Sequence, residues 1–287
     1  MQALAENIYY QDSYAGVILG AVTFPGGTLL IDTPLRAEDA RTWKAALLTQ
    51  SRGTHRLITV LDIHADRTLG NRAIEYPIIT HNNTALAYKE RTTIFKGQHI
   101  KTGAEWEHYP EVNGTRWERP NITFSTTLSL QWGGPEIRIE HHPGPTSGAS
   151  WVHIPEHRIV FIGDAVCNNQ PPFIARADLD VWHETLNLLS SRAFADYTII
   201  SGRSGFITID DIREQRKFLK SISGRLETVS KRKNQMEEID KMIPSLLEKL
   251  DYPPEFNEFY SQRLYYGLHE YFARTYLQDS ILNEAEE

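Results

Sequence analysis

Short apolar runs alternate with amphipathic segments over the first part of the chain. The run RLITVLD (56–62) is almost entirely apolar, which is typical of a strand that is buried on both faces. Pro25-Gly26-Gly27 lies between two β-rich runs and predicts a hairpin turn. The pattern predicts strands over 15–24, 28–34, 56–62 and 76–80, and helices over 37–50, 69–75 and 82–91.

A polar stretch over residues 92–120 has no clear period, and we interpret it as a long loop or insertion near the functional site. A second β-rich block follows, and then the amphipathic segment DLDVWHETLNLLSSR (178–192). On a helix, one face of this segment carries Leu179, Trp182, Leu186 and Leu189. The second block and the run after this helix predict strands over 122–132, 136–142, 147–155, 158–166 and 197–202.

From Asp210 almost to the end of the chain the pattern is helical. Pro244 is expected in an early helical turn or at a kink, and Pro253-Pro254 marks a break. The three pieces cover 212–230, 236–250 and 256–277. The sequence therefore predicts an α/β domain over 1–206 and a helical C-terminal extension over 207–287 that packs on it.

The last helical piece is dense in aromatic residues spaced three to five positions apart, which places them on a helix face. We interpret this face as packing against the rest of the protein. Two alternatives are the seam of a homodimer formed through the C-terminal helices, and a wall of the substrate pocket. The residues are Phe256, Phe259, Tyr260, Tyr265, Tyr266, Tyr271, Phe272 and Tyr276.

Composition excludes several classes of partner. The 287 residues carry a net charge of −7 without a Lys/Arg-rich run, which argues against nucleic acid. No apolar stretch approaches the ~20 residues that a membrane span needs, and the N-terminus does not resemble a signal peptide. A single cysteine, Cys167, excludes an internal disulfide and suits a reducing compartment, so we expect a cytoplasmic protein.

The segment TVLDIHADRTLGN carries candidate chemistry. Asp62, His64 and Asp66 recur at every second position after the predicted strand 56–62. Side chains two apart share a face of an extended segment, so these three polar groups would converge at the end of a buried strand. Taken alone the pattern is a weak signal, and the alternative is a solvated loop in which Asp66 caps the next helix.

Further motifs, in a consistent order between residues 8 and 220, give this loop a context. They are IDTP, DIHADRTLGN, IITHNNT, HHPGPTSGAS, RIVFIGDAV, NNQPPF and IISGRSG. With them the whole chain resembles the metallo-β-lactamase superfamily, in particular its bacterial branch of glyoxalase-II-like hydrolases. The resemblance implies an α/β fold, a four-layer αβ/βα sandwich with an active site along one edge. It also implies two metal ions that generate hydroxide from bridging water.

Most of the family's ligand positions are changed in this chain. The family uses a His-x-His-x-Asp-His loop, a Gly-His-Thr loop, a Gly-Asp strand end and a final Gly-His. The positions that match are His64, Asp66 and Asp164, and the positions that differ are Asp62, Arg67, Pro145 and Arg203. Arginine has only donors and stays charged, so it is a very poor metal ligand. We therefore expect an ion-pair cluster of Asp66, Asp164, Arg67 and Arg203 in place of the second ion.

The first metal position is more open. Asp62, His64 and Asp164 could hold at most one ion, and this donor set suits zinc, manganese or iron. Yet Asp164 cannot fully serve both an ion and two arginines, and the carboxylate of Asp62 is shorter than the imidazole it replaces. We expect no cofactor, and one divalent metal ion is the alternative.

These residues lead to three functional hypotheses. The first is a pseudoenzyme, or a protein that binds an anionic small molecule through Arg67 and Arg203, rather than a conventional dinuclear zinc hydrolase. The second is a single-metal hydrolase of an ester, thioester or lactone that uses Asp62, His64 and Asp164. The third is a structural role in which the helical extension forms a homodimer.

Other reactive side chains lie near the motifs. His141 or His142 could replace the missing imidazole after a loop shift, but we expect His141 to end a strand and His142 to be solvated. His81 is expected to be a cap or a packed histidine. Cys167 lacks an evident base, so we interpret it as a small buried hydrophobic residue rather than a nucleophile.

Overall fold

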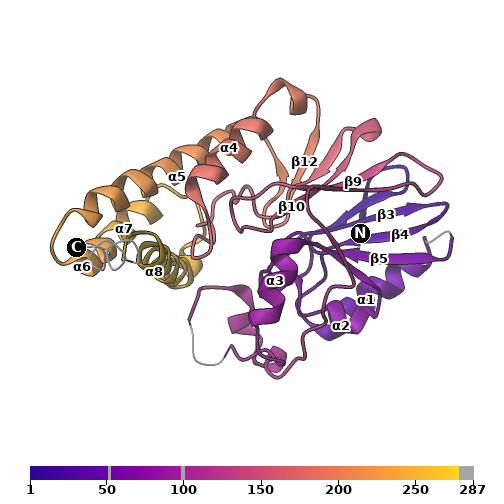
Figure 1. Cartoon of the computed structure of the whole chain (residues 1–287), viewed down its shortest axis with the longest axis horizontal. Helices are drawn as coiled ribbons and strands as arrows, with labels where there is room; N and C mark the ends of the chain where they lie inside the picture. The colour runs from indigo at the N-terminus through magenta and orange to yellow at the C-terminus, as the bar shows by residue number, and fades with distance from the viewer. Residues whose placement is uncertain (51–52, 98–100, 278–287) are drawn as a thin grey trace.

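The computed structural model of the chain describes residues 1–50, 53–97 and 101–277. Residues 98–100 of the predicted 92–120 insertion, and residues 278–287 of the predicted extension, lie outside this range. Two sheets form the centre of the protein and helices cover their outer faces, as Figure 1 shows. This arrangement confirms the predicted α/β sandwich with C-terminal helices.

The first sheet has seven strands in sequential order, β1 to β7. Strands β1 to β4 pair antiparallel, and β4, β5, β6 and β7 pair parallel. Parallel neighbours end at the same edge of a sheet, so the loops that follow β4, β5 and β6 lie next to one another. The strands are β1 (Gln2–Ala5), β2 (Ile8–Gln11), β3 (Leu19–Phe24), β4 (Gly27–Ile31), β5 (His55–Thr59), β6 (Ile78–His81) and β7 (Ile122–Phe124).

The second sheet has the order β13-β12-β11-β10-β9-β8. Its strands pair antiparallel except for β11 and β12, which are parallel and therefore end at the same edge. The strands are β8 (Thr127–Leu130), β9 (Ile137–His141), β10 (Ser150–Ile154), β11 (Ile159–Phe161), β12 (Thr198–Ser201) and β13 (Gly205–Ile207).

Alternating side chains of each sheet build two faces of core. In β4, Leu29 and Ile31 face the second sheet, whereas Leu30 faces the helices outside. In β11, Phe161 faces the first sheet and Val160 faces outward. Because every layer boundary is apolar, the two sheets and their helices stack in four layers.

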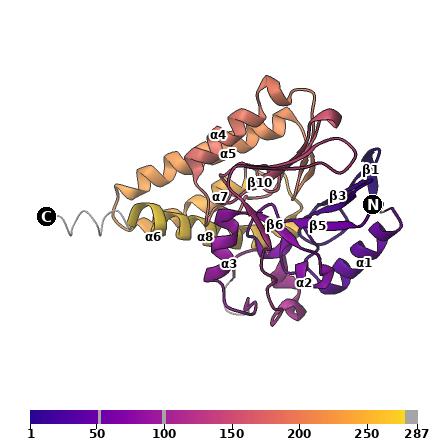
Figure 2. The ribbon, with the colours of Figure 1, turned by 45° about the vertical axis from the view of Figure 1, so that its right-hand side comes forward.

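The helices cover the two outer faces, and α5 to α8 extend to one side of the sheets in both views (Figures 1 and 2). Helices α1 and α2 share an apolar cluster with the first sheet, and α4, α5, α7 and α8 share one with the second. The helices are α1 (Ala37–Leu48), α2 (Asn71–Ile74), α3 (Asn82–Glu90), α4 (Leu179–Leu189), α5 (Ile209–Ser230), α6 (Gln235–Asp240), α7 (Met242–Leu247) and α8 (Asn257–Phe272). Among the described helices, none combines the length and apolarity that crossing a bilayer requires.

The helical extension follows the sequence pattern closely. Pro244 lies in the first turn of α7, and the predicted piece 236–250 divides into α6 and α7. Tyr260, Tyr271 and Phe272 of α8 are buried in the same cluster as the four apolar residues of α4. Their packing agrees with our interpretation of the aromatic face, whereas Phe256 and Tyr265 of the same set are exposed, at 38% and 46%. The homodimer seam stays a prediction.

Two features of the strands differ from the prediction. The run 122–132 forms two strands, since β7 pairs in the first sheet and β8 pairs in the second. An apolar run looks the same whichever sheet receives it, so the sequence could not reveal this crossing. Strands β1, β2 and β13 were not predicted, because they are short and their apolar alternation is weak.

The core assignment of α4 can be tested at Trp182, whose side chain is fully buried and whose Nε1 donates to the carbonyl of Ala165 at 2.9 Å. Trp182→Ala is expected to lower the free energy of unfolding by about 3–5 kcal/mol, because it leaves a cavity. Leu188→Ala, on the same helix but 41% exposed, should cost at most about 0.5 kcal/mol. Urea denaturation followed by circular dichroism measures both, and equal losses would contradict the assignment.

Candidate functional site

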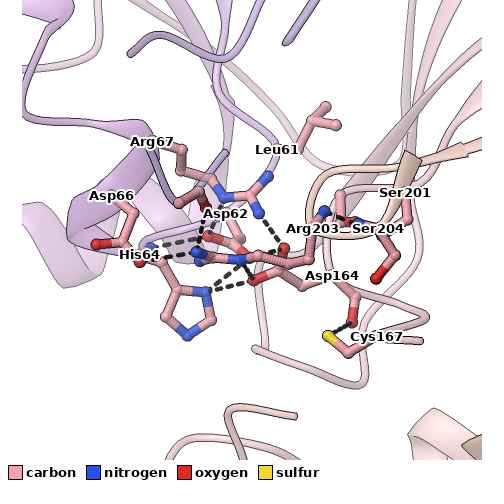
Figure 3. Close-up of polar contacts among 12 residues, drawn as sticks. Leu61, Asp62, His64, Asp66, Arg67, Asp164, Cys167, Ser201, Arg203 and Ser204 are labelled. Atoms are coloured by element: carbon pink, nitrogen blue, oxygen red, sulfur yellow. Dashed lines mark hydrogen bonds and ion pairs between the residues drawn. The ribbon is translucent and has the colours of Figure 1, made fainter. Parts of the chain in front are cut away.

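Four connections meet at the edge where the parallel strands of both sheets end. Asp32 follows β4, the loop after β5 carries residues 60–67, Asp164 follows β11, and Arg203 lies in the turn between β12 and β13. Figure 3 shows the charged side chains of three of these connections converging on one another. The sheets thus bring together groups that are far apart in the sequence.

Arg67 lies at the centre of this cluster and is fully buried. Its Nη1 lies 2.5 Å from Oδ2 of Asp32, and its Nε lies 3.2 Å from Oδ1 of Asp62. Its Nη2 pairs with Oδ1 of Asp164. Burial would lower the pKa of Arg67, but the three carboxylates outweigh it and raise the pKa. One guanidinium therefore neutralises parts of three acidic side chains.

Arg203 approaches the cluster from the second sheet (Figure 3). Its Nε lies 3.1 and 3.2 Å from the two oxygens of Asp164, and its Nη1 lies 2.7 Å from Oδ2 of Asp66. The other oxygen of Asp66 accepts from the backbone N–H of Trp106 at 3.2 Å. The predicted cluster of Asp66, Asp164, Arg67 and Arg203 is thus assembled around Asp164, although Arg67 also pairs with Asp32 and Asp62.

His64 belongs to the same network. Its Nδ1 lies 2.9 Å from Oδ2 of Asp62 and 3.1 Å from Oδ2 of Asp164. Burial would lower the pKa of His64, but the two carboxylates outweigh it and raise the pKa to about 9. Its ring centre lies 5.0 Å from that of Phe173, and its side chain lines a neighbouring cavity. His64 is therefore a third cation of the network at neutral pH.

Burial and the neighbouring cations shift the pKa values of the aspartates in opposite directions. Burial would raise the pKa of Asp164, but the guanidinium groups of Arg203 and Arg67 outweigh it and hold the pKa well below its usual value. For Asp32 burial is the larger effect, and it raises the pKa to about 6 although Arg67 opposes it. Asp164 is thus the acid of the network whose ionised form the neighbouring cations stabilise most strongly.

Asp32 is the network member that sequence reasoning missed. It is 1% exposed, adopts a left-handed backbone conformation with φ of 59°, and accepts from the backbone N–H of Leu61 at 2.9 Å. Asp32 belongs to the IDTP motif, but only the parallel pairing of β4 and β5 shows that its side chain reaches Arg67.

Two glycines make room for Arg67. A Cβ added to Gly202 would lie 2.9 Å from Nη1 of Arg67 and 3.0 Å from its Nη2, which is closer than real Cβ contacts. Gly163 has a φ of +57°, a conformation that side chains rarely adopt, and its carbonyl accepts from the N–H of Gly202 at 2.6 Å. The glycines of the Gly-Asp and Gly-Arg motifs therefore shape the space that the guanidinium fills.

The two metal ions that the fold family implies do not fit these residues. Asp66 and Asp164 would be ligands of the second ion, yet their oxygens accept from Arg203 and Arg67. The donor nitrogens of arginine repel a dication rather than bind it. The second ion and the guanidinium groups exclude each other.

A single ion is a separate case. The candidate ligand atoms of Asp62, His64 and Asp164 lie within 4.8 Å of one another. However, Nδ1 of His64 is at hydrogen-bond distance from both carboxylates, so a proton occupies the direction in which a metal would need the lone pair. An ion could enter only if His64 lost this proton and the carboxylates turned away from their arginines.

The remaining predicted residues lie nearby but outside the network. Pro145 is buried in the loop 144–146, and Cys167 is buried with burial raising its pKa to about 12, in agreement with a structural thiol. His141 ends β9 as expected, stacked 3.6 Å from the ring centre of His81. The prediction of a solvated His142 was wrong, because its ring stacks on Trp151 with centres 3.8 Å apart.

A cavity of about 250 Å³ adjoins the network on the side of His64 and Asp66. Three further arginines, Arg91, Arg176 and Arg263, line it, and sequence reasoning identified none of them. Arg263 comes from α8, so the helical extension contributes to the site. Its aromatic spacing suggested a pocket wall as an alternative, but no motif marked the arginine.

Comparisons with known proteins came from sequence and from structure. A family model described as the metallo-beta-lactamase superfamily matches residues 20–201. A metallo-beta-lactamase from Pontibacter korlensis is 17% identical over 76% of this chain and 97% of its own, with a TM-score of 0.59. A metallo-beta-lactamase family protein from Thermus thermophilus is 17% identical over 95% of both chains, with a TM-score of 0.62. No curated protein matches the sequence.

A larger protein shares the fold over nearly the whole of this chain. The stereoselective inverting sec-alkylsulfatase Pisa1 from Pseudomonas sp. is 12% identical over 95% of this chain, with a TM-score of 0.63. The matched part is 49% of the sulfatase. At these identities the structural likeness concerns the fold alone.

The role of Arg67 can be tested by Arg67→Met, which removes the charge and keeps much of the volume. The expected loss in free energy of unfolding is about 3–5 kcal/mol, because buried carboxylates lose their partner. The matched control is Arg72→Met, since Arg72 is 52% exposed and pairs only with Glu118, at 3.3 Å, among the residues described. Thermal and urea unfolding measure both variants, and a loss below about 1 kcal/mol for Arg67→Met would contradict a buried network.

The raised pKa of His64 predicts a particular pH dependence. Its folded pKa of about 9 lies above its ordinary value of 6.5, so the protonated ring stabilises the fold fully below pH 6.5. This contribution is lost as the pH rises through about 9. The free energy of unfolding of the wild type should therefore fall over this range relative to His64→Gln. Parallel pH profiles of the two proteins would count against a charged His64.

Proposed function

The chain belongs to the metallo-beta-lactamase superfamily, and from that premise we propose that it is a metal-independent member that binds a small anionic molecule. The single observation that carries the metal independence is the fully buried guanidinium of Arg67 in contact with Asp32, Asp62 and Asp164. A positive charge of the protein itself thus balances carboxylates that the family would use as metal ligands. The two-metal activation of water is therefore not its chemistry.

Charge balance supports this proposal. A buried carboxylate is costly without a cation, and the fold family's solution is a dication. In this chain the two guanidinium groups and His64 supply the positive charge, with the short contacts described above. The network can hold the site's loops together without an ion.

The binding role rests on the neighbouring cavity. Arg67 and Arg203 are held by aspartates, so they are not the groups that would receive an anionic ligand, contrary to our first hypothesis. The cavity wall instead offers other arginines, which suits an anion. We place this activity in the cytoplasm, which the single buried cysteine supports.

One alternative has an observation of its own. The ligand atoms of Asp62, His64 and Asp164 lie within 4.8 Å of one another, as a single-ion site requires. The alternative function is a single-metal hydrolase of an ester, thioester or lactone. An ion at this site would have to replace the hydrogen bonds between His64 and the carboxylates of Asp62 and Asp164. For this reason we favour the metal-independent role.

Metal content separates the two functions. The protein purified without chelator is expected to contain far less than one equivalent of zinc, manganese or iron by plasma mass spectrometry. Its melting temperature should stay the same with a chelator or with added Zn²⁺ or Mn²⁺, because its charges are already paired. About one tightly held ion per chain, with a melting temperature that falls in chelator, would support the single-metal hydrolase instead.

A matched variant controls for a failure to load metal. The quadruple substitution Asp62→His, Arg67→His, Pro145→His and Arg203→His restores the family's ligand types at all four changed positions. It should take up Zn²⁺ under the conditions in which the wild type does not, whereas Arg67→His alone should not. Zinc uptake by wild type and quadruple variant alike would count against the proposal.

A further inference from the structure

The two arginines of the 250 Å³ cavity that are not exposed, Arg91 and Arg263, lack an acidic partner among the residues that the structure describes. Arg91 and Arg263 are absent from its ion pairs, whereas Arg67 and Arg203 each contact at least two carboxylates. A poorly solvated guanidinium without a counter-charge costs free energy. A negative charge from a bound molecule would remove that cost.

Arg263 is held firmly but by neutral groups. It is 5% exposed, its Nε donates to the carbonyl of Gly103 at 2.7 Å, and its Nη1 donates to Oε1 of Gln170 at 3.0 Å. Nη1 also donates to the carbonyl of Pro171 at 3.2 Å. Burial lowers its pKa to about 10, and the positive charge of Arg203 adds to this effect. The side chain is positioned without being neutralised.

Arg91 follows α3 on another wall of the cavity. Its Nη2 donates to the carbonyl of Ile63, and its guanidinium lies 4.0 Å from the ring centre of Trp117. Its Nη1 is buried and has no hydrogen-bond partner within the described ranges. Burial lowers the pKa of this arginine to about 10. An unpartnered, buried donor on a cavity wall indicates a missing acceptor.

The rest of the wall is largely apolar. Its main apolar side chains are Ile63, Phe95, Trp106, Phe173, Ile174 and Tyr266. The ring of Phe173 is fixed between two guanidinium groups, 4.2 Å from that of Arg263 and 4.7 Å from that of Arg203. The volume lies below the ~300–1,000 Å³ typical of drug-sized ligands, so the occupant is small.

The free donors and the charge of the wall favour one kind of anion. The contacts above occupy Nε and Nη1 of Arg263 and one N–H of Nη2 of Arg91. Nη2 of Arg263 and Nε and Nη1 of Arg91 make no hydrogen bond within the described ranges, so each guanidinium can donate to one oxygen of a carboxylate. A phosphate monoester carries a charge of about −1.5 to −2. Asp66 lines the same cavity and opposes such a dianion more than a monoanion.

We propose that this cavity binds a small organic monocarboxylate with an apolar or aromatic body. Arg91 and Arg263 hold the carboxylate, and the body packs against Trp106, Phe173 and Tyr266. This inference rests on the proposed function, because it names the chemical class of the anion that the metal-independent protein binds. Arg176, an exposed side chain on the same wall, adds positive charge that attracts anions.

Isothermal titration calorimetry of the full chain tests the proposal with butyrate, hexanoate, benzoate and phenylacetate. At least one of these should bind, and its neutral amide should bind about tenfold more weakly or worse, because the charge-assisted hydrogen bonds are lost. Phenyl phosphate should bind more weakly than phenylacetate. Failure of all four acids, equal affinity for acid and amide, or tighter binding of phenyl phosphate would overturn the assignment.

Variants connect the affinity to the two arginines. Arg91→Gln and Arg263→Lys should each weaken binding about tenfold or more, since both remove a free guanidinium donor. Arg213→Gln, on the exposed face of α5, is the matched control and should leave affinity unchanged. Because Arg263 is buried, melting temperatures without ligand show whether its variant folds, and Arg91→Gln carries the test if it does not. Unchanged affinity in Arg91→Gln would overturn the proposal.

The two proposals fail in different ways. A sample that holds one ion per chain and still binds a carboxylate through Arg91 would refute the metal-independent function and leave the cavity assignment intact. A metal-free sample that binds none of the four acids would refute the cavity assignment and leave the metal-independent function intact. Metal analysis and calorimetry on the same preparation therefore distinguish them.

Discussion

Four aspartates are buried together below one edge of the two sheets, and the surrounding structure has to satisfy this concentration of negative charge. They are Asp32, Asp62, Asp66 and Asp164, each at most 3% exposed. Buried carboxylates persist only with cations and hydrogen-bond donors beside them. Here the cations are parts of the chain, so the charge balance of the site is a property of the folded protein. Asp164 receives three of them, and the network is arranged around its two oxygens.

The network is possible only because the backbone is shaped for it. Parallel pairing of β4 with β5 and of β11 with β12 places the four connections at one edge. The left-handed Asp32 and Gly163 turn the chain sharply there, and the missing side chain of Gly202 leaves space for a planar guanidinium. The same edge opens into the cavity, where Phe173 separates Arg203 from Arg263. The network, in which four aspartates outnumber three cations, therefore adjoins a cavity wall that carries positive charge.

Sequence reasoning reached the family, the sandwich and the Asp/Arg substitutions, because these depend on short motifs in a fixed order. The resemblance also placed Asp164, 97 positions from Arg67, in one ion-pair cluster with it, but it did not supply Asp32 and Asp62 as further partners of Arg67. Asp32 stood in a recognised motif, yet its contact needs the register of β4 against β5. Arg263 was not identified for another reason: it lies among aromatic residues on a helix, and their spacing, which allowed a pocket wall only as an alternative to packing, does not single out an arginine. Local patterns predict elements, whereas charge partners follow from topology.

The three carboxylates that contact Arg67 also limit which substitutions this site tolerates. Replacing this arginine alone by a neutral imidazole leaves Asp32 without a counter-charge among the residues described and Asp62 with His64 alone, while Arg203 still pairs with Asp66. Restoring one ligand position at a time is therefore expected to lower the stability of the fold before a metal ion can bind. Apolar residues of the cavity wall, such as Tyr266, take no part in these ion pairs. Such residues can be exchanged, and the shape of the pocket altered, without removing an ion pair of the network.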